Sequence, residues 1–135
     1  MPNQINESSL ITELQKQAGE VLVRHRSILD IMTKLDEYNA RINRAVAKSV
    51  TSCGCIGIEA KKQEFSTESF DETLSIIDSH VVGTICPTCK EILEQEIGAY
   101  IFFLSSLAST LDFDLARTIE KELDRTKTLG VYGMK

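Results

Sequence analysis

Apolar residues recur at helical spacing along most of this chain. Over residues 28–50 they form two rows that each repeat every seven positions, Ile28, Leu35 and Ile42 beside Ile31, Tyr38 and Ala45. A more strongly apolar stretch over residues 90–110 has the same spacing, carried by Ile92, Leu93, Ile97, Ile101, Leu104, Leu107 and Ala108 and widened by Phe102 and Phe103. Weaker helical patterns cover residues 8–23 and 115–127. The sequence therefore predicts an all-α fold, a bundle of four to five helices.

Helix boundaries are marked by small polar residues and by one weakly patterned stretch. The candidate N-terminal caps are Ser8 or Ser9, Ser27, and Asp112 or Asp114. Between residues 54 and 85 the pattern weakens, which predicts a mostly exposed loop. Within this loop a short helix is expected from about Phe70 to His80, stopped by Gly83.

Length and charge limit the classes of function. At 135 residues, the chain is the size of one domain, and we expect a single helical domain over residues 1–135. A net charge of −5 argues against general nucleic-acid binding, which needs a broadly basic face.

The sequence also indicates where the protein resides. Its first residues are polar and acidic and lack the pattern of a secretory signal. No apolar run approaches the roughly twenty residues that a membrane span requires. We therefore expect a cytoplasmic protein without a membrane partner.

The chain has four cysteines, in two close pairs about thirty residues apart, Cys53-Gly54-Cys55 and Cys86-Pro87-Thr88-Cys89. Four thiolates in tetrahedral geometry are a common structural zinc site. The pairs are expected at the end of the 28–50 helix and just before the helix that begins near Lys90, which is the same end of a helical hairpin. One shared ion would form a metal knuckle there and pin a metal-binding insertion around residues 51–90.

Other interpretations of the cysteines stay open at this point. An iron–sulfur cluster also takes four thiolates, although the Cys-X-Cys spacing favours zinc. Two disulfides are disfavoured by the reducing cytoplasm, and four inert buried thiols are the remaining alternative. His80, six residues before Cys86, is a substitute ligand or, more simply, a polar residue at a helix end.

A basic stripe runs beside the apolar face of the 28–50 helix. Lys34, Arg41 and Lys48 recur every seven residues, with Arg44 close by. Such a stripe is either a solvated face or an anion-binding surface, since arginine forms forked contacts with phosphate.

Residues 94–104 and 111–115 resemble the MazG-type all-α nucleoside triphosphate pyrophosphohydrolases. In that family a Glu-Glu-X-X-Asp motif opens an apolar helix, and a short loop leads into a charged terminal helix. Residues 34–46 are similar to the context of an earlier Glu-Glu-X-X-Glu motif, and the resemblance covers about two thirds of the chain. It implies a homo-oligomeric helical bundle, a dimer or tetramer, in which acidic side chains on facing helices hold magnesium and, through it, the phosphates of a nucleotide.

This chain departs from the family pattern at the acidic motifs. The first reads Glu37-Tyr38-X-X-Arg41 and the second Gln95-Glu96-X-X-Ala99, so that Glu96 alone remains of the four implied ligands. One carboxylate cannot hold magnesium in this way, and Arg41 repels a nearby cation. Glu96 is instead expected to pair with Arg41 or Arg44.

We therefore predict a zinc-stabilised MazG-like protein that is non-catalytic and binds a protein partner, a nucleotide or another phosphorylated ligand. The candidate metal ligands are Cys53, Cys55, Cys86 and Cys89; the residual family-site or anion-binding residues are Glu37, Arg41, Arg44, Lys48 and Glu96. The alternative is a nucleoside triphosphate pyrophosphohydrolase with an altered magnesium site, built from Glu37, Glu91, Glu94 and Glu96, and magnesium is expected only in that case.

Overall fold

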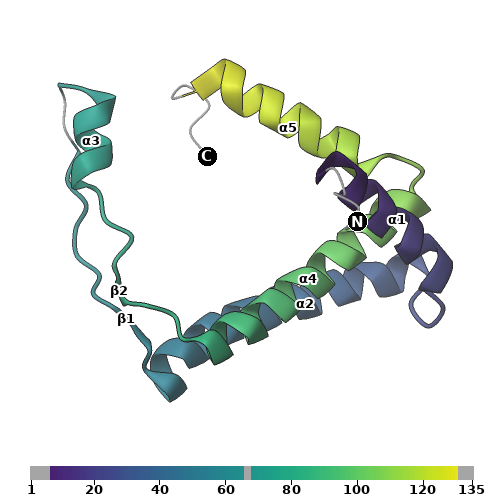
Figure 1. Ribbon diagram of the computed structural model, residues 1–135, viewed down its shortest axis with the longest axis horizontal. Helices are drawn as coiled ribbons and strands as arrows, with labels where there is room; N and C mark the ends of the chain where they lie inside the picture. The colour runs from purple at the N-terminus through teal and green to yellow at the C-terminus, as the bar shows by residue number, and fades with distance from the viewer. Residues whose placement is uncertain (1–6, 66–67, 131–135) are drawn as a thin grey trace, which may run out of the picture. The chain divides into compact units, whose positions relative to one another are not determined.

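The computed structural model describes residues 7–65 and 68–130, with side chains from Leu10 onward (Figure 1). In chain order the elements are α1 (Glu7–Val21), α2 (Ile28–Lys48), a π-helical turn η1 (Ser49–Cys53), β1 (Ile56–Ile58), α3 (Phe70–Ile76), β2 (Val81–Gly83), α4 (Pro87–Thr110) and α5 (Leu115–Leu129). Five α-helices dominate the described residues, which confirms the mostly helical character. The candidate caps Ser8 and Ser9 lie outside the described side chains.

The chain divides into two compact units. The helical unit comprises Met1–Ile42 with Gln95–Lys135, and the insertion unit comprises Asn43–Glu94. The expectation of a single domain with an insertion around 51–90 stays a prediction, because this division does not decide whether either unit folds by itself.

The core of the helical unit lies where α2 and α4 run side by side (Figure 1). Leu22, Ile31 and Phe103 are buried, and the partly buried residues packed against them are Leu35, Tyr38, Phe102 and Leu107. The rings of Tyr38 and Phe103 stack with centroids 5.5 Å apart. Ile31, Leu35 and Tyr38 share one face of α2, so three of the six positions of the predicted repeat contribute to this core, with Ile31 fully buried and the other two partly buried.

Small hydroxyl residues extend this core along α4. Ser105 and Ser106 are buried, and their hydroxyls donate to the carbonyls of Ile101 and Phe102 at 2.9 and 3.0 Å. Each hydroxyl is thus hydrogen-bonded within its own helix, so these small side chains can be buried without another polar partner. The predicted apolar stripe of α4 is only partly buried, because Ile97 and Ile101 are each 38% exposed.

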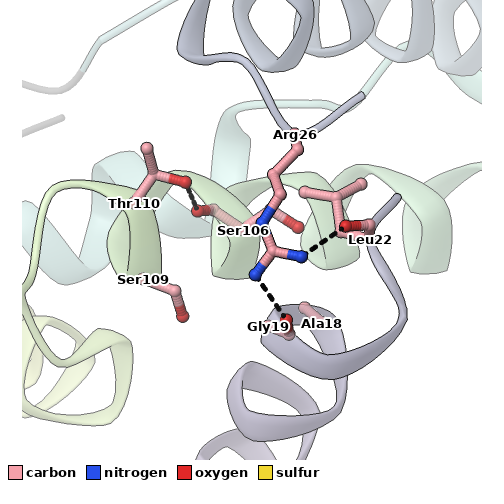
Figure 2. Close-up of a pocket in the computed structure, with 7 residues that line it drawn as sticks. All are labelled: Ala18, Gly19, Leu22, Arg26, Ser106, Ser109 and Thr110. Atoms are coloured by element: carbon pink, nitrogen blue, oxygen red, sulfur yellow. Dashed lines mark hydrogen bonds between the residues drawn. The ribbon is translucent and has the colours of Figure 1, made fainter. Parts of the chain in front are cut away.

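The α1–α2 junction is held by an arginine. The first helix ends at Val21, two residues before its predicted end. The Arg26 guanidinium donates to the carbonyls of Leu22 and Gly19 at 3.3 and 3.4 Å, so it satisfies carbonyls at the end of α1 (Figure 2). It also borders a cavity of about 370 Å³ lined by Ala18, Gly19, Leu22, Ser106, Ser109 and Thr110.

The turn between α4 and α5 is fixed by a cap and by a clamp from α1. Asp114 accepts from the backbone amides of Ala116 and Arg117 at 2.9 and 3.4 Å, so of the two alternatives predicted for the cap of this helix, Asp112 and Asp114, it is Asp114 that caps it. The Gln15 side chain donates to the carbonyl of Phe113 at 2.8 Å and accepts from the amide of Leu115 at 2.9 Å.

The insertion unit contains a hairpin that the sequence pattern did not predict. β1 and β2 pair antiparallel, with Ile56 opposite Gly83 and Ile58 opposite Val81. The helix expected from Phe70 to His80 ends at Ile76, where Ile77 turns extended. Three-residue strands are too short to show a period of two, so only their β-branched composition marks them.

Among the described residues, no single helix is long and apolar enough to cross a membrane. Only α4 and α5 taken together reach that length and hydropathy, and these two helices are bent by 107°.

Candidate metal centre

The first cysteine pair lies on the turn that leads out of α2. The helix continues into the wider π-helical turn η1, whose last residue is Cys53. Gly54 follows in the left-handed region, with φ of 76°, and its amide donates to the Ser49 carbonyl at 2.9 Å. This C-terminal cap reverses the chain, so that Cys55 directly precedes β1.

The second pair brackets the start of α4. Helix α4 begins at Pro87 and not near Lys90, so Cys89 lies inside its first turn and not before the helix. Proline fits this position because its missing N–H has no partner to lose there. The Cys86 sulfur accepts from the backbone amide of Cys89 at 3.4 Å, and the Cys86 carbonyl accepts from the amide of Lys90 at 2.9 Å.

The hairpin brings the two pairs together, and it depends on a glycine. Gly83 has φ of 84°, and a Cβ built on it would lie 2.6 Å from the carbonyl oxygen of Cys55. A close backbone approach of this kind excludes any side chain. Gly83 was expected to stop a helix; it instead lets the strand before Cys86 contact the strand after Cys55.

The four sulfurs form one cluster. The ligand atoms of Cys53, Cys55, Cys86 and Cys89 all lie within 4.8 Å of one another, and those of Cys53 and Cys86 are 3.8 Å apart. Four sulfurs about 2.3 Å from one tetrahedral zinc ion are separated by about 3.8 Å. All four cysteines are free, with Cys53 exposed and the others half-buried. The predicted convergence is confirmed, and it is compatible with a site for zinc or another metal.

The thiols perturb one another strongly. The Cys89 backbone amide, helped by the Cys89 thiol, lowers the pKa of Cys86 to about 7. The Ser49 side chain favours the Cys89 thiolate, but the Cys86 thiol and desolvation outweigh it and raise the pKa of Cys89 to about 12. Four thiols this close cannot all ionise unless a cation offsets their charge. A dication bound here would hold all four deprotonated.

Two residues of this site were missed from the sequence. Ser49 is buried, and its carbonyl oxygen accepts a hydrogen bond from the Cys55 thiol at 3.8 Å. The Ser49 side chain also favours the thiolate form of Cys89. Gly83 was noticed only as a helix stop. The sequence did carry a signal for this role of Gly83, because it directly follows two valines and lies three residues before a cysteine pair.

His80 lies outside the cysteine cluster. It has a left-handed backbone with φ of 61°, and its carbonyl accepts from the amide of Glu59 at 2.9 Å beyond the end of the hairpin. The Nε2 atom of His80 is buried without a hydrogen-bond partner, and His80 does not belong to the group formed by the four cysteines.

The two candidate carboxylates, Glu37 and Glu96, are paired with cations. Glu37 accepts from Lys34 at 2.7 Å and from Arg41 at 3.1 Å, and these bonds lower its pKa. Arg41 also lies 3.8 Å from Glu96, one of the two pairings expected from the sequence, and its guanidinium stacks over Tyr38. Among the described residues, neither carboxylate belongs to a group of three or more candidate metal ligands.

The rest of the basic stripe lies on the last turns of α2. Arg44 and Lys48 are four residues apart, share one helix face and are exposed. They belong to the insertion unit, whereas Arg41 belongs to the helical unit.

Comparisons of the chain with protein-family models, with curated proteins and with solved structures found no match.

Proposed function

We propose that this chain is a zinc-stabilised helical protein that acts by binding and not by catalysis. The observation that carries the proposal is the approach of four cysteine sulfurs to within 4.8 Å of one another. Four thiolates fill the tetrahedral coordination of zinc and leave no position for water or substrate, which is the pattern of a structural site. An iron–sulfur cluster binds its cysteines through different irons and spreads their sulfurs farther apart than a single ion does.

The zinc ion would replace a hydrophobic core in the insertion unit. Among its described residues, 43–65 and 68–94, no apolar side chain is buried, and Ser49 is the one buried residue. A unit without an apolar core needs another source of stability. Structural zinc supplies on the order of 10 kcal/mol to small domains of this kind.

The proposal that the scaffold is MazG-like but non-catalytic draws support from Arg41. Its guanidinium neutralises Glu37 and lies near Glu96, the two carboxylates nearest the family motifs. A magnesium ion would have to displace this arginine and would still have too few ligands. The binding role is therefore assigned to a protein partner or to a phosphorylated ligand, with Arg44 and Lys48 as exposed cations for the latter.

We further propose a cytoplasmic homo-oligomer, a dimer or tetramer. Ile97 and Ile101 on α4, each 38% exposed, are one turn apart, as are Ile119 and Leu123 on α5, at 44% and 51%. Such paired apolar residues on helix faces are typical of surfaces that other helices cover.

A paired assay of hydrolysis and binding tests this function. The zinc-loaded chain is incubated with magnesium and each nucleoside triphosphate, and pyrophosphate release is measured beside a thermal-shift screen of the same nucleotides. We expect no release above buffer. Magnesium-dependent release that disappears in Glu96→Gln but persists in the control Glu13→Gln, an exposed glutamate of α1 outside every proposed site, would overturn the non-catalytic assignment.

A further inference from the structure

Helix α3 is held in the insertion unit by an N-terminal cap and by two hydrogen bonds across the base of its loop. The Ser69 hydroxyl accepts from the amide of Glu72 at 3.1 Å and so caps the helix. The Gln63 side chain donates to the Asp78 carbonyl at 2.6 Å and accepts from the Asp78 amide at 3.1 Å. These two bonds close the loop that carries α3, much as a further rung of the hairpin would. A seven-residue helix fixed at both ends presents its side chains in a defined arrangement.

One face of α3 is an exposed apolar stripe. Phe70 and Leu74 lie one turn apart on α3, and Ile77, the C-cap residue directly after the helix, continues the i, i+4, i+7 spacing; the three are 45%, 52% and 38% exposed. Apolar side chains at this spacing are typical of a helix surface that packs against a second helix.

The sequence around the stripe is mainly acidic, and its nearest cations in the chain are Lys61 and Lys62, directly before Gln63. Residues 63–80 contain five acidic residues, Glu64, Glu68, Asp71, Glu72 and Asp78, and no lysine or arginine. Pairing with a second α3 would bring like charges together, and an anionic membrane surface would be repelled. The complementary surface is apolar in its centre and basic at its edge.

We propose that α3 is the docking site for a basic amphipathic helix of another protein. Phe70, Leu74 and Ile77 receive its apolar side chains, and the acidic residues of 63–80 contact its lysines or arginines. This inference rests on the proposed binding function, for which it names a surface and the chemistry of the partner.

A model peptide tests the docking site on the full zinc-loaded chain. The probe is a fluorescent fourteen-residue helix of leucine and lysine, with leucines on one face; its counterparts are the same peptide with glutamate for lysine and a scrambled leucine–lysine sequence. Binding is measured by anisotropy at low and high salt. The test variant is Phe70→Ser with Leu74→Ser, and the control is Leu10→Ser with Leu129→Ser, two residues exposed to a similar degree on other helices.

We expect salt-sensitive binding of the basic amphipathic peptide, at least ~10-fold weaker in the α3 variant and unchanged in the control, as for truncation of central anchor residues. Binding that survives in the α3 variant, equal binding of the scrambled peptide, or no binding to the unmodified chain would overturn the inference. A fall in the light-scattering mass of the chain alone, caused by the α3 variant, would assign the stripe to a second copy instead. Zinc content is measured on the same samples, so that loss of zinc refutes the proposed function separately from the docking site.

Discussion

Replacing Gly83 by alanine should disrupt the cysteine cluster without touching a cysteine. Gly83 and Gly54 both have left-handed backbones, with φ of 84° and 76°, but only Gly83 lies against another chain segment. Gly54→Ala is therefore a matched control. It imposes the same conformational strain, and its Cβ meets nothing within 4 Å.

The two substitutions differ in one free-energy contribution. A left-handed alanine costs roughly 1–2 kcal/mol at either position. At Gly83 the new Cβ is 2.6 Å from the Cys55 oxygen, below the 3.0 Å that real contacts respect, so the backbone beside a ligand must move by about 0.4 Å or more. Metal–ligand distances in established sites stay within about 0.2 Å of their standard values. Overpacking of this kind costs a further ~1–3 kcal/mol, which corresponds to roughly 5- to 150-fold in affinity.

Competition with a chromophoric zinc chelator measures this difference directly. We expect Gly54→Ala to weaken zinc binding by about tenfold and Gly83→Ala by about fivefold more at the least. Circular dichroism of the helical signal shows whether both variants still fold with zinc in excess. Equal zinc affinities in the two variants would refute the argument that close backbone approach at Gly83 assembles the site.

Three further predictions address the helical unit. Asp114→Ala removes the cap of α5 and should cost about 1 kcal/mol in the free energy of unfolding, measured with urea; an unchanged value would contradict the cap. Glu37 should titrate below the 4.5 of an ordinary glutamate in a carbon-13 NMR pH series, because hydrogen bonds from Lys34 and Arg41 favour its ionised form. Lys34→Met should raise the titration midpoint of Glu37. The small stability that this pairing adds is present above the pKa that Glu37 has in the unfolded chain, and it disappears as the pH falls through its lower pKa in the folded chain. Ile119→Ser with Leu123→Ser should lower the light-scattering mass of the oligomer, and an unchanged mass would show that α5 is not at the interface.

Long-period features of the sequence predicted the structure well. The seven-residue repeat of α2 places Ile31, Leu35 and Tyr38 in the core, and Asp114 caps the helix that its position indicated. The cysteine cluster was predictable from the positions of the two cysteine pairs, one at the end of a helix and the other at the start of the next long helix. The two pairs meet when the segment between them brings the chain back to the same end of the helical hairpin. The pairing of Arg41 with Glu96 was expected because an arginine stands in the segment that resembles an acidic motif, where a carboxylate would be.

Short and context-dependent features were not predictable in the same way. The strands at Ile56–Ile58 and Val81–Gly83 are too brief to show alternation, and their pairing depends on a long-range contact at Gly83. The start of α4 at Pro87 is a capping effect, which an apolar pattern beginning at Ile92 does not mark. Partial exposure of the α4 stripe depends on what else covers that helix, and no local pattern contains this information.

The most direct test of the account is the metal in protein purified without added metal, by elemental analysis together with X-ray absorption at the metal edge. The account predicts one zinc per chain with four sulfur neighbours at about 2.3 Å, lost together when Cys86 is replaced by serine. Metal-free protein that keeps its full helical signal, iron accompanied by inorganic sulfide, or zinc with oxygen and nitrogen neighbours would contradict it.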